Sequence, residues 1–213
     1  MKRILAILAA VIAVSACLDV DPILFRTLTM GFVKNDGSLR ADDGHIYTFG
    51  DRTPEWSAGE RVVALLDAQK ALNDSVYQAG NLSFTYPLYK KPVVVTSSTE
   101  PDTLGTNEIR LTDAWYAGGC LNMSAQIKMI EGAGKEIVNL MIDKRGEASP
   151  DTLRLALRHR SDYESYVGDP STVYAFYASF PLREYMPAKD SVVIKISWLW
   201  DGKTAGTQAK VEK

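Results

Sequence analysis

The feature that most constrains the fold is an unbroken alternation of apolar and polar side chains in LNMSAQIKM, residues 121–129. Successive side chains of a β-strand point to opposite faces of its sheet, so this alternation predicts a strand with one buried face and one exposed face. The buried face would carry Leu121, Met123, Ala125, Ile127 and Met129. A chain organised around such a segment is expected to form sheets that share a core.

Further strand patterns follow at roughly ten-residue spacing. Leucines alternate with other residues in LRLALRHR, EIVNLMI precedes it, and residues 173–180 are rich in aromatic side chains. In the last segment, Ile194, Ile196, Trp198 and Trp200 share one face, Lys195 and Ser197 face the other way, and Asp201-Gly202 ends the strand. Several short strands separated by turns are typical of an antiparallel β-sandwich, which we place at residues 113–202 with a polar C-terminal tail at 203–213.

The first half of the chain, residues 26–96, also favours β-structure. TLTMGFVK and HIYTFG are strand-like, and NDGS between them is a turn. GERVVALLDAQ is ambiguous, because Ser57 and Glu60 have the spacing of a helix capping box, but the short β-segments on both sides favour a strand. Pro87 and Pro92 restrict residues 83–96 to sheet edges or strand ends. Residues 97–112 begin with a stretch rich in Ser, Thr, Pro and Gly, which predicts a linker.

The N-terminus has the pattern of a lipoprotein leader. Lys2 and Arg3 precede an uncharged apolar run at residues 4–14, which is too short to span a membrane and fits the hydrophobic region of a signal peptide. The small residues Ser15-Ala16 and then Cys17 follow, and V-S-A-C resembles the bacterial lipobox, although Leu is usual in the place of its Val. We therefore expect a signal peptide at 1–16, cleavage between Ala16 and Cys17, acylation of Cys17, and a lipidated tether at 17–25. An ordinary signal peptide with a chance cysteine is the alternative.

Asp19 and Asp21 follow the cysteine directly. Acidic residues at this place resemble the export signal of surface lipoproteins in Bacteroides-type bacteria. We expect an outer-membrane protein held by its lipid, with the cell surface and the periplasm both open as the side it faces.

Composition excludes some classes of function. Without residues 1–16 the chain has 197 residues and a net charge of −4, from 22 basic and 26 acidic side chains. Such a balance offers no basic field for nucleic acid. With Cys17 acylated, Cys120 is the only thiol left, so no intrachain disulfide can form.

The leader, the early β half with GERVV, and the later LRLALRHR and VVIKISWLWDG together resemble the NigD-like lipoproteins of Bacteroides-type bacteria. The resemblance covers nearly the whole mature chain, but none of its motifs is catalytic. It implies an all-β protein with a small OB-like barrel followed by a β-sandwich. The family's name comes from a bacteriocin operon, and a role in bacteriocin immunity has been suggested for it.

Catalytic and metal-binding patterns are not evident in the sequence. His45 and His159 lie in different halves, and neither has the spacing of a metal site. His159 extends the leucine face of its strand, so we interpret it as a strand-end residue at the rim of the core. GAGKE lacks the first Gly and the Ser or Thr of a phosphate loop, and Cys120 is expected to be an inert buried thiol. We expect no enzymatic activity, no catalytic or metal-binding residue and no cofactor.

Three hypotheses for function remain. The first is a lipid-anchored protein that binds a protein partner, such as a toxin or an envelope component. The second is a surface glycan-binding protein that uses aromatic residues such as Tyr174, Phe176 and Trp198 as a stacking platform, although such alternating aromatics more often belong to the core. The third is an unrecognised envelope hydrolase. Asp102-Thr103-Leu104 also matches the pattern that Bacteroides-type bacteria use for O-glycosylation, so we expect Thr103 to be a glycosylation site.

Overall fold

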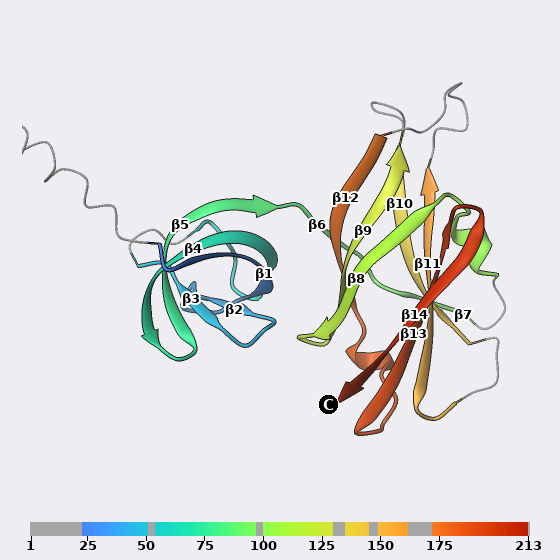
Figure 1. Ribbon diagram of the computed structural model, residues 1–213. Coiled ribbons are helices and arrows are strands. Elements are labelled where there is room, and N and C mark those ends of the chain that lie inside the picture. Colours follow the sequence, from blue (N-terminus) through green and yellow to red (C-terminus); the bar gives the residue numbers. More distant parts are fainter. Residues whose placement is uncertain are drawn as a thin grey trace, which may run out of the picture. The chain divides into compact units, whose positions relative to one another are not determined.

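The computed structural model describes residues 23–50, 54–96, 100–129, 135–144, 149–161 and 172–212. It divides into two compact units, Met1–Thr85 and Tyr86–Lys213. The described parts of both units are built of β-strands (Figure 1), as the sequence predicts. The boundary between the two units falls between residues 85 and 86, whereas the sequence predicted it after residue 96.

The first unit is a closed five-stranded barrel with the strand order β1-β2-β3-β5-β4. Its strands pair antiparallel where β1 meets β2 and β4, whereas β3 and β5 are parallel. This is the arrangement of an OB-fold, a small Greek-key barrel. The strands are β1 (Phe25–Val33), β2 (Leu39–Ala41), β3 (Ile46–Thr48), β4 (Arg61–Asn73) and β5 (Val76–Tyr86).

The ambiguous segment GERVVALLDAQ forms strand β4, so the preference for a strand is confirmed. Val62 and Leu66 face the barrel core, and Arg61 is also buried because its guanidinium lies over the Phe32 ring, 4.6 Å from the centroid. Both faces of β4 are therefore covered at its start, which removes the period-two pattern from its sequence. The capping-box residues do meet, as the Ser57 backbone N–H donates to Glu60 Oε2 at 3.0 Å, but they form a turn before a strand.

The barrel interior is closely packed. Tyr47 is 1% exposed and stacks on Tyr77 with ring centroids 6.0 Å apart. Burial raises the pKa of Tyr47 to about 12. Gly31 lies where β1 and β2 approach so closely that a Cβ atom would stand 2.3 Å from the Arg40 carbonyl oxygen. A larger residue at this position would force the two strands apart.

The second unit is a sandwich of two sheets. One has the order β14-β13-β11-β10-β7 and the other the order β6-β12-β9-β8. The strands are β6 (Leu88–Lys90), β7 (Val94–Thr96), β8 (Ile109–Ala117), β9 (Cys120–Met129), β10 (Glu136–Asp143), β11 (Thr152–Ser161), β12 (Thr172–Pro181), β13 (Ser191–Trp200) and β14 (Lys203–Glu212). Two short 3-10 helices, η1 (Pro101–Leu104) and η2 (Arg183–Tyr185), complete it.

The sandwich is mixed rather than wholly antiparallel, because β13 pairs parallel with β11 and the short strands β6 and β7 pair parallel with β12 and β10. The proline-flanked strands β6 and β7 lie at sheet edges, as predicted. The inner faces predicted for β9, β11 and β13 are confirmed, but the opposite face of β9 is not exposed as predicted, because Asn122 is fully buried and the other residues of that face are partly buried. Leu121, Met123 and Ile127 are at most 3% exposed, and Leu157 and Ile194 are at most 2% exposed.

Two strands of the sandwich lie where the sequence predicted none. Strand β8 begins inside the expected linker, and residues 203–212 of the expected polar tail form β14. Asp201 and Gly202 have φ values of 50° and 66°, and these positive values make the tight turn that joins β13 to β14. The chain therefore folds back at this turn and adds an edge strand.

Candidate functional site

The residues proposed for lipidation and cleavage, Cys17 and Ala16, lie outside the described residues. The first described residues are apolar and exposed: Ile23 is 48% and Leu24 is 53% exposed. The Leu24 backbone N–H donates to the Ala68 carbonyl at 2.7 Å, which joins this segment to β4. Five residues separate Cys17 from Ile23, so the six steps from Cα to Cα between them span at most about 20 Å.

Thr103 lies on η1, and its side chain is exposed. Its hydroxyl donates to the Glu100 carbonyl at 2.7 Å. The helix rests on the sandwich, because the Asn139 amide donates to the Leu104 carbonyl at 2.9 Å and Arg158 Nε lies 3.3 Å from Asp102 Oδ1. The described part of the expected linker is thus attached to the second unit.

His159 is fully buried rather than at the rim of the core. Its Nδ1 lies 3.0 Å from the Glu108 carbonyl oxygen, and its Nε2 lies 2.6 Å from Glu136 Oε2. The Ser161 hydroxyl donates to the other oxygen of Glu136 at 2.8 Å. Three polar side chains therefore continue the apolar inner faces of β10 and β11 at one end of the sandwich.

This cluster does not have the geometry of a hydrolytic triad. In a triad the histidine accepts the proton of the nucleophilic hydroxyl, whereas Ser161 bonds the carboxylate here and not the imidazole. His45 belongs to the barrel, where its Nδ1 lies 3.0 Å from Asp43 Oδ2. Within the described ranges, no three His, Cys, Asp or Glu side chains are placed to hold a metal ion.

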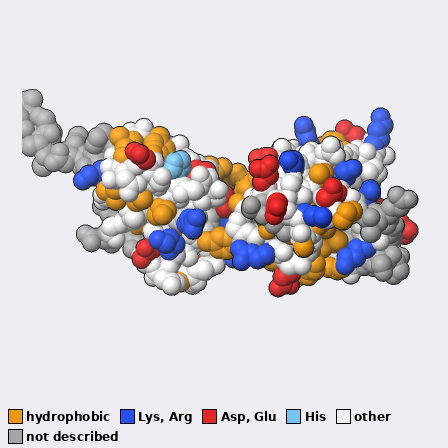
Figure 2. Space-filling model, turned by 90° about the horizontal axis from the view of Figure 1, so that it is seen from below, with side chains coloured by type: hydrophobic (Ala, Val, Ile, Leu, Met, Phe, Trp, Pro, Cys, Tyr) orange, Lys and Arg blue, Asp and Glu red, His pale blue; other side chains and the backbone are white. Residues whose placement is uncertain are grey.

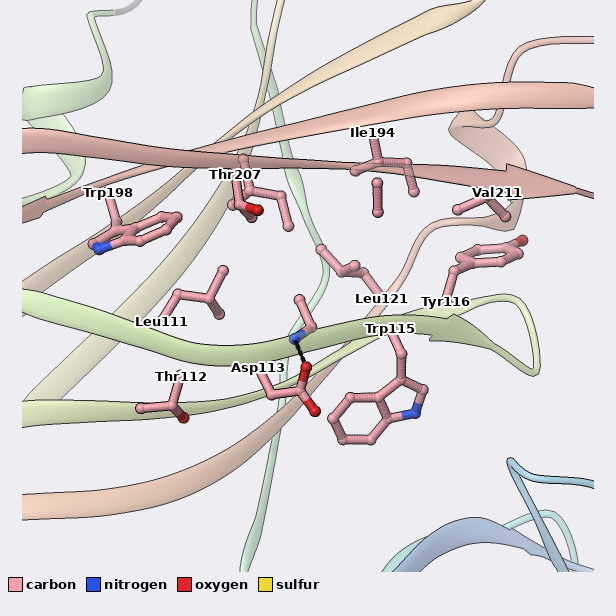
Figure 3. A pocket seen from close by; sticks show the side chains of 13 residues that line it. Leu111, Thr112, Asp113, Trp115, Tyr116, Leu121, Ile194, Trp198, Thr207 and Val211 are labelled. Carbon is pink, nitrogen blue, oxygen red and sulfur yellow. Dashed lines mark hydrogen bonds between the residues drawn. The ribbon is translucent and has the colours of Figure 1, made fainter.

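An apolar opening lies between the edge strands of the two sheets, β8 and β14. This edge crevice has a volume of about 230 Å³. In Figure 3, Leu111 and Leu121 point into it from one sheet and Ile194, Thr207 and Val211 from the other, while Trp198 and Tyr116 stand towards its two ends. Burial raises the pKa of Tyr116, so its hydroxyl stays protonated.

Small residues on β14 leave the space open. Ala205, Thr207 and Ala209 are the partners of Trp198, Ile196 and Ile194 on β13 and therefore share the inner face. Alanine and threonine are too short to reach β8 across the sandwich. The crevice is thus a consequence of side-chain size on the edge strand.

A β-bulge shapes the opposite wall. The pairing of β8 with β9 shifts between Leu111 and Asp113, and the Ala114 backbone N–H donates to Asp113 Oδ1 at 2.8 Å. The bulge places the side chains of Asp113 and Trp115 on the side of β8 that faces away from β14 (Figure 3), although both residues line the opening together with Ala114 and Tyr116. The bulge and the lysines of β14 are devices that discourage another strand from extending either sheet.

The β13–β14 turn is attached to the other sheet. Glu108 accepts a hydrogen bond from Lys128 Nζ at 2.7 Å and another from the Gly202 backbone N–H at 3.1 Å. The bond from Lys128 is the main cause that lowers the pKa of Glu108. Lys128 Nζ also lies 5.0 Å from the centroid of the Trp200 ring. We call Glu108, Lys128 and Gly202 the corner of the sandwich. Its hydrogen bonds join the two sheets and so fix the distance between the two walls at one end of the crevice.

The aromatic residues expected as core or platform divide into two groups. Phe180 is fully buried, and Phe176 and Trp198 are partly buried against the core. Tyr174 is 48% exposed on the same face of β12. Cys120 is a free cysteine that is partly exposed, not buried as expected.

The described surface carries charges of both signs, as the composition suggests (Figure 2). On the face in Figure 2, acidic and basic side chains are interspersed and form no field of a single sign. Among the residues that the structure describes, no helix is long and apolar enough to cross a membrane.

Residues 91–209, which include all of the crevice lining except Val211, match the family model described as the NigD-like C-terminal beta sandwich domain. The chain belongs to the NigD-like family. A search of curated proteins found no match.

Solved structures resemble this NigD-like protein over most of its length. A NigD-like immunity protein from Bacteroides caccae is 16% identical, with a TM-score of 0.60 over 90% of this chain and 98% of that one. A protein described as toxin-related from Parabacteroides distasonis is 15% identical, with a TM-score of 0.64 over 88% and 94%. One described as a lipoprotein from Bacteroides fragilis is 12% identical, with a TM-score of 0.63 over 88% and 98%. At these identities the likeness concerns the fold alone.

The sequence did not indicate the crevice of this NigD-like protein, because both of its edge strands were missed. The one available signal was the alternation of small residues in TAGTQAKV after the Asp-Gly turn. A short turn of this type followed by a segment as long as the preceding strand is a hairpin pattern.

Proposed function

We propose that the protein is a lipid-anchored envelope protein of the bacteriocin-immunity type, which binds a protein partner at the edge crevice. The crevice itself is the observation that carries the proposal. It exposes an apolar lining between two sheet edges, and apolar openings of this kind are typical of protein-interaction sites. The solved immunity and toxin-related proteins with the same fold support a protein as the partner.

The mode of binding follows from the walls. The bulge in β8 and the lysines Lys203 and Lys210 in β14 disfavour an added strand. We therefore expect the partner to insert apolar side chains between Trp198 and Tyr116 rather than to continue a sheet.

A photoreactive diazirine residue tests this mode in living cells. Thr207 lines the crevice, whereas its neighbour Gln208 pairs with the exposed Lys195 on the outer face. A diazirine residue at position 207 should give a discrete cross-linked protein adduct, and one at position 208 should not. In a second variant, Ala209→Trp should fill the crevice and remove the adduct at unchanged protein abundance. Equal adducts from both positions, or none from position 207, would contradict the proposal.

The anchor is proposed to be Cys17, acylated after cleavage behind Ala16, in the outer membrane. The exposed apolar residues Ile23 and Leu24 support it, because the chain from Cys17 to Leu24 spans at most about 25 Å and so keeps both residues near the lipid. One buried acyl chain binds only reversibly, and two or three hold a protein stably.

Metabolic labelling with a clickable fatty acid tests the anchor, with the second cysteine as a matched control. Cys17→Ala should lose the label and leave the membrane fraction. Cys120→Ala should keep both. Equal labelling of the two variants would show that Cys17 is not the acceptor.

Thr103 is also proposed as an O-glycosylation site, supported by its exposure on η1. The intact mass of native protein should exceed that of lipidated chain alone, and Thr103→Ala should remove the excess. An unmodified mass would contradict the proposal.

A further inference from the structure

A second opening lies at the opposite edge of the sandwich, between β12 and β10. Strand β6 covers β12 only at residues 177–179, and β7 covers β10 only at residues 141–143. The remaining halves of β12 and β10 have no neighbouring strand on that side among the described residues. A pocket of about 270 Å³ lies there, which we call the tyrosine pocket.

Aromatic rings form its walls. Tyr174 and Phe176 come from β12 and Tyr89 from β6, and Val138 and Ile127 complete the apolar lining. Tyr89 is held in place because its hydroxyl donates to the Val138 carbonyl at 3.0 Å. Tyr174 is 48% exposed, so one aromatic face is available from solvent.

One carboxylate lines the pocket in a fixed orientation. Glu136 accepts from the Ser161 hydroxyl at 2.8 Å and lies 2.6 Å from His159 Nε2, and its side chain is 16% exposed. Each carboxylate oxygen has more than one lone pair, so both can still accept a further hydrogen bond. Pockets that bind small molecules characteristically combine an apolar lining with a few such oriented polar groups.

The hydrogen bonds of His159 determine the net charge of the His159–Glu136 pair. His159 Nδ1 faces the Glu108 carbonyl oxygen, which can only accept a hydrogen bond, so Nδ1 carries a proton. The contact of Nε2 with Glu136 then requires one more proton between them, on the imidazole or on the carboxyl. In both arrangements the His159–Glu136 pair has no net charge.

A neutral, aromatic pocket of this size with an oriented acceptor fits a particular chemistry. A pyranose ring presents C–H groups on its faces, which pack on aromatic rings, and hydroxyl groups at its rim, which donate to a carboxylate. An ammonium ligand would be favoured by an unpaired carboxylate, which is not present here. Drug-sized ligands occupy about 300–1,000 Å³, so this pocket accommodates a single ring.

We propose that the tyrosine pocket binds one uncharged sugar ring of a glycan, stacked on Tyr174 and hydrogen-bonded to Glu136. This goes beyond the proposed function and does not depend on the anchor or on the edge crevice. Ser161 and His159 are positioning residues, since they hold the carboxylate and do not line the pocket.

Saturation-transfer NMR and calorimetry on the chain from Leu18 to Lys213 test the proposal. The probes are the methyl glycosides of glucose, galactose, mannose, xylose and N-acetylglucosamine, and tetramethylammonium as the cationic probe. We expect at least one glycoside to bind and tetramethylammonium not to compete. Tyr174→Ala should weaken that binding by about tenfold or more, equivalent to about 1.4 kcal/mol. Tyr185→Ala removes another exposed tyrosine, from η2, and should leave glycoside binding unchanged.

Glu136→Gln provides a second variant that keeps the shape of the side chain. It should weaken glycoside binding while leaving the Tyr174 ring exposed and the protein folded. Three results would overturn the proposal: no glycoside binds, tetramethylammonium binds in their place, or Tyr174→Ala binds as well as the wild type.

Discussion

The two open edges of the sandwich differ in what their strands contribute. At the β8–β14 edge, small residues on one strand and a bulge in the other leave an apolar crevice. At the β10–β12 edge, short strands stop early and uncover aromatic rings and a held carboxylate. The same two-sheet core therefore produces one opening suited to apolar side chains and one suited to a polar ring.

The largest effect is expected at the polar edge. His159→Ala removes a fully buried ring and leaves the carboxylate of Glu136 without its charged or proton-sharing partner. Such a change should cost about 3–5 kcal/mol of unfolding free energy. Urea melting of the chain from Leu18 onward measures it. Ser161→Ala is the milder control, at about 1 kcal/mol. Equal, small costs for both would mean that the polar cluster does not support this edge.

A smaller effect is expected at the crevice. Trp198 packs on the core but is only partly buried, so Trp198→Ala should cost about 2–3 kcal/mol, less than a fully buried aromatic residue. Lys195→Ala on the outer face should stay within about 0.5 kcal/mol. Urea melting of both variants measures the two changes in unfolding free energy. If the two costs were reversed, the register of β13 would be shifted by one residue.

Filling the crevice should be tolerated. Ala209→Leu adds an apolar side chain where the wild type has open space, so we expect a change of less than about 1 kcal/mol in either direction. In a close-packed core the same enlargement costs about 1–3 kcal/mol. Thermal melting distinguishes the two. A large loss of stability would show that the walls are already in contact.

The smallest effect concerns the corner that fixes the crevice walls. Because its bonds lower the pKa of Glu108, this carboxylate stabilises the fold above its unfolded pKa, and the contribution is lost as the pH falls through its folded pKa. Glu108→Gln should cost less than about 1 kcal/mol at neutral pH. The difference between variant and wild type should shrink in acid. Unfolding curves between pH 3 and pH 7 measure it, and a difference that grew in acid would contradict the assignment.

Period-two alternation predicted the strands whose inner faces are apolar and regular, such as β9 and β13. It failed for β8, where the bulge after Leu111 interrupts the period and moves Asp113 outward. It failed for β14 because the inner residues Thr207 and Ala209 are small, so the strand reads as a polar tail. Both failures border the crevice, since the features that hide these strands also create the opening.

The polar cluster of His159, Glu136 and Ser161 could not be predicted from the sequence, for a different reason. The position of His159 on the leucine face was predictable from the spacing, but its partners come from distant segments. Glu136 lies on β10, the strand paired with the β11 strand of His159, and the Glu108 carbonyl belongs to the segment leading into β8. Contacts of this kind depend on tertiary packing, which no local pattern specifies.

The most direct test of the difference between the two edges compares cross-linking from both in the same cells. A diazirine residue replaces Thr207 in the crevice or Tyr174 in the tyrosine pocket, and the adducts are analysed for protein. We expect a discrete protein adduct from position 207 and none from position 174. A protein adduct from position 174 with none from position 207 would contradict the assignment of the crevice to a protein partner.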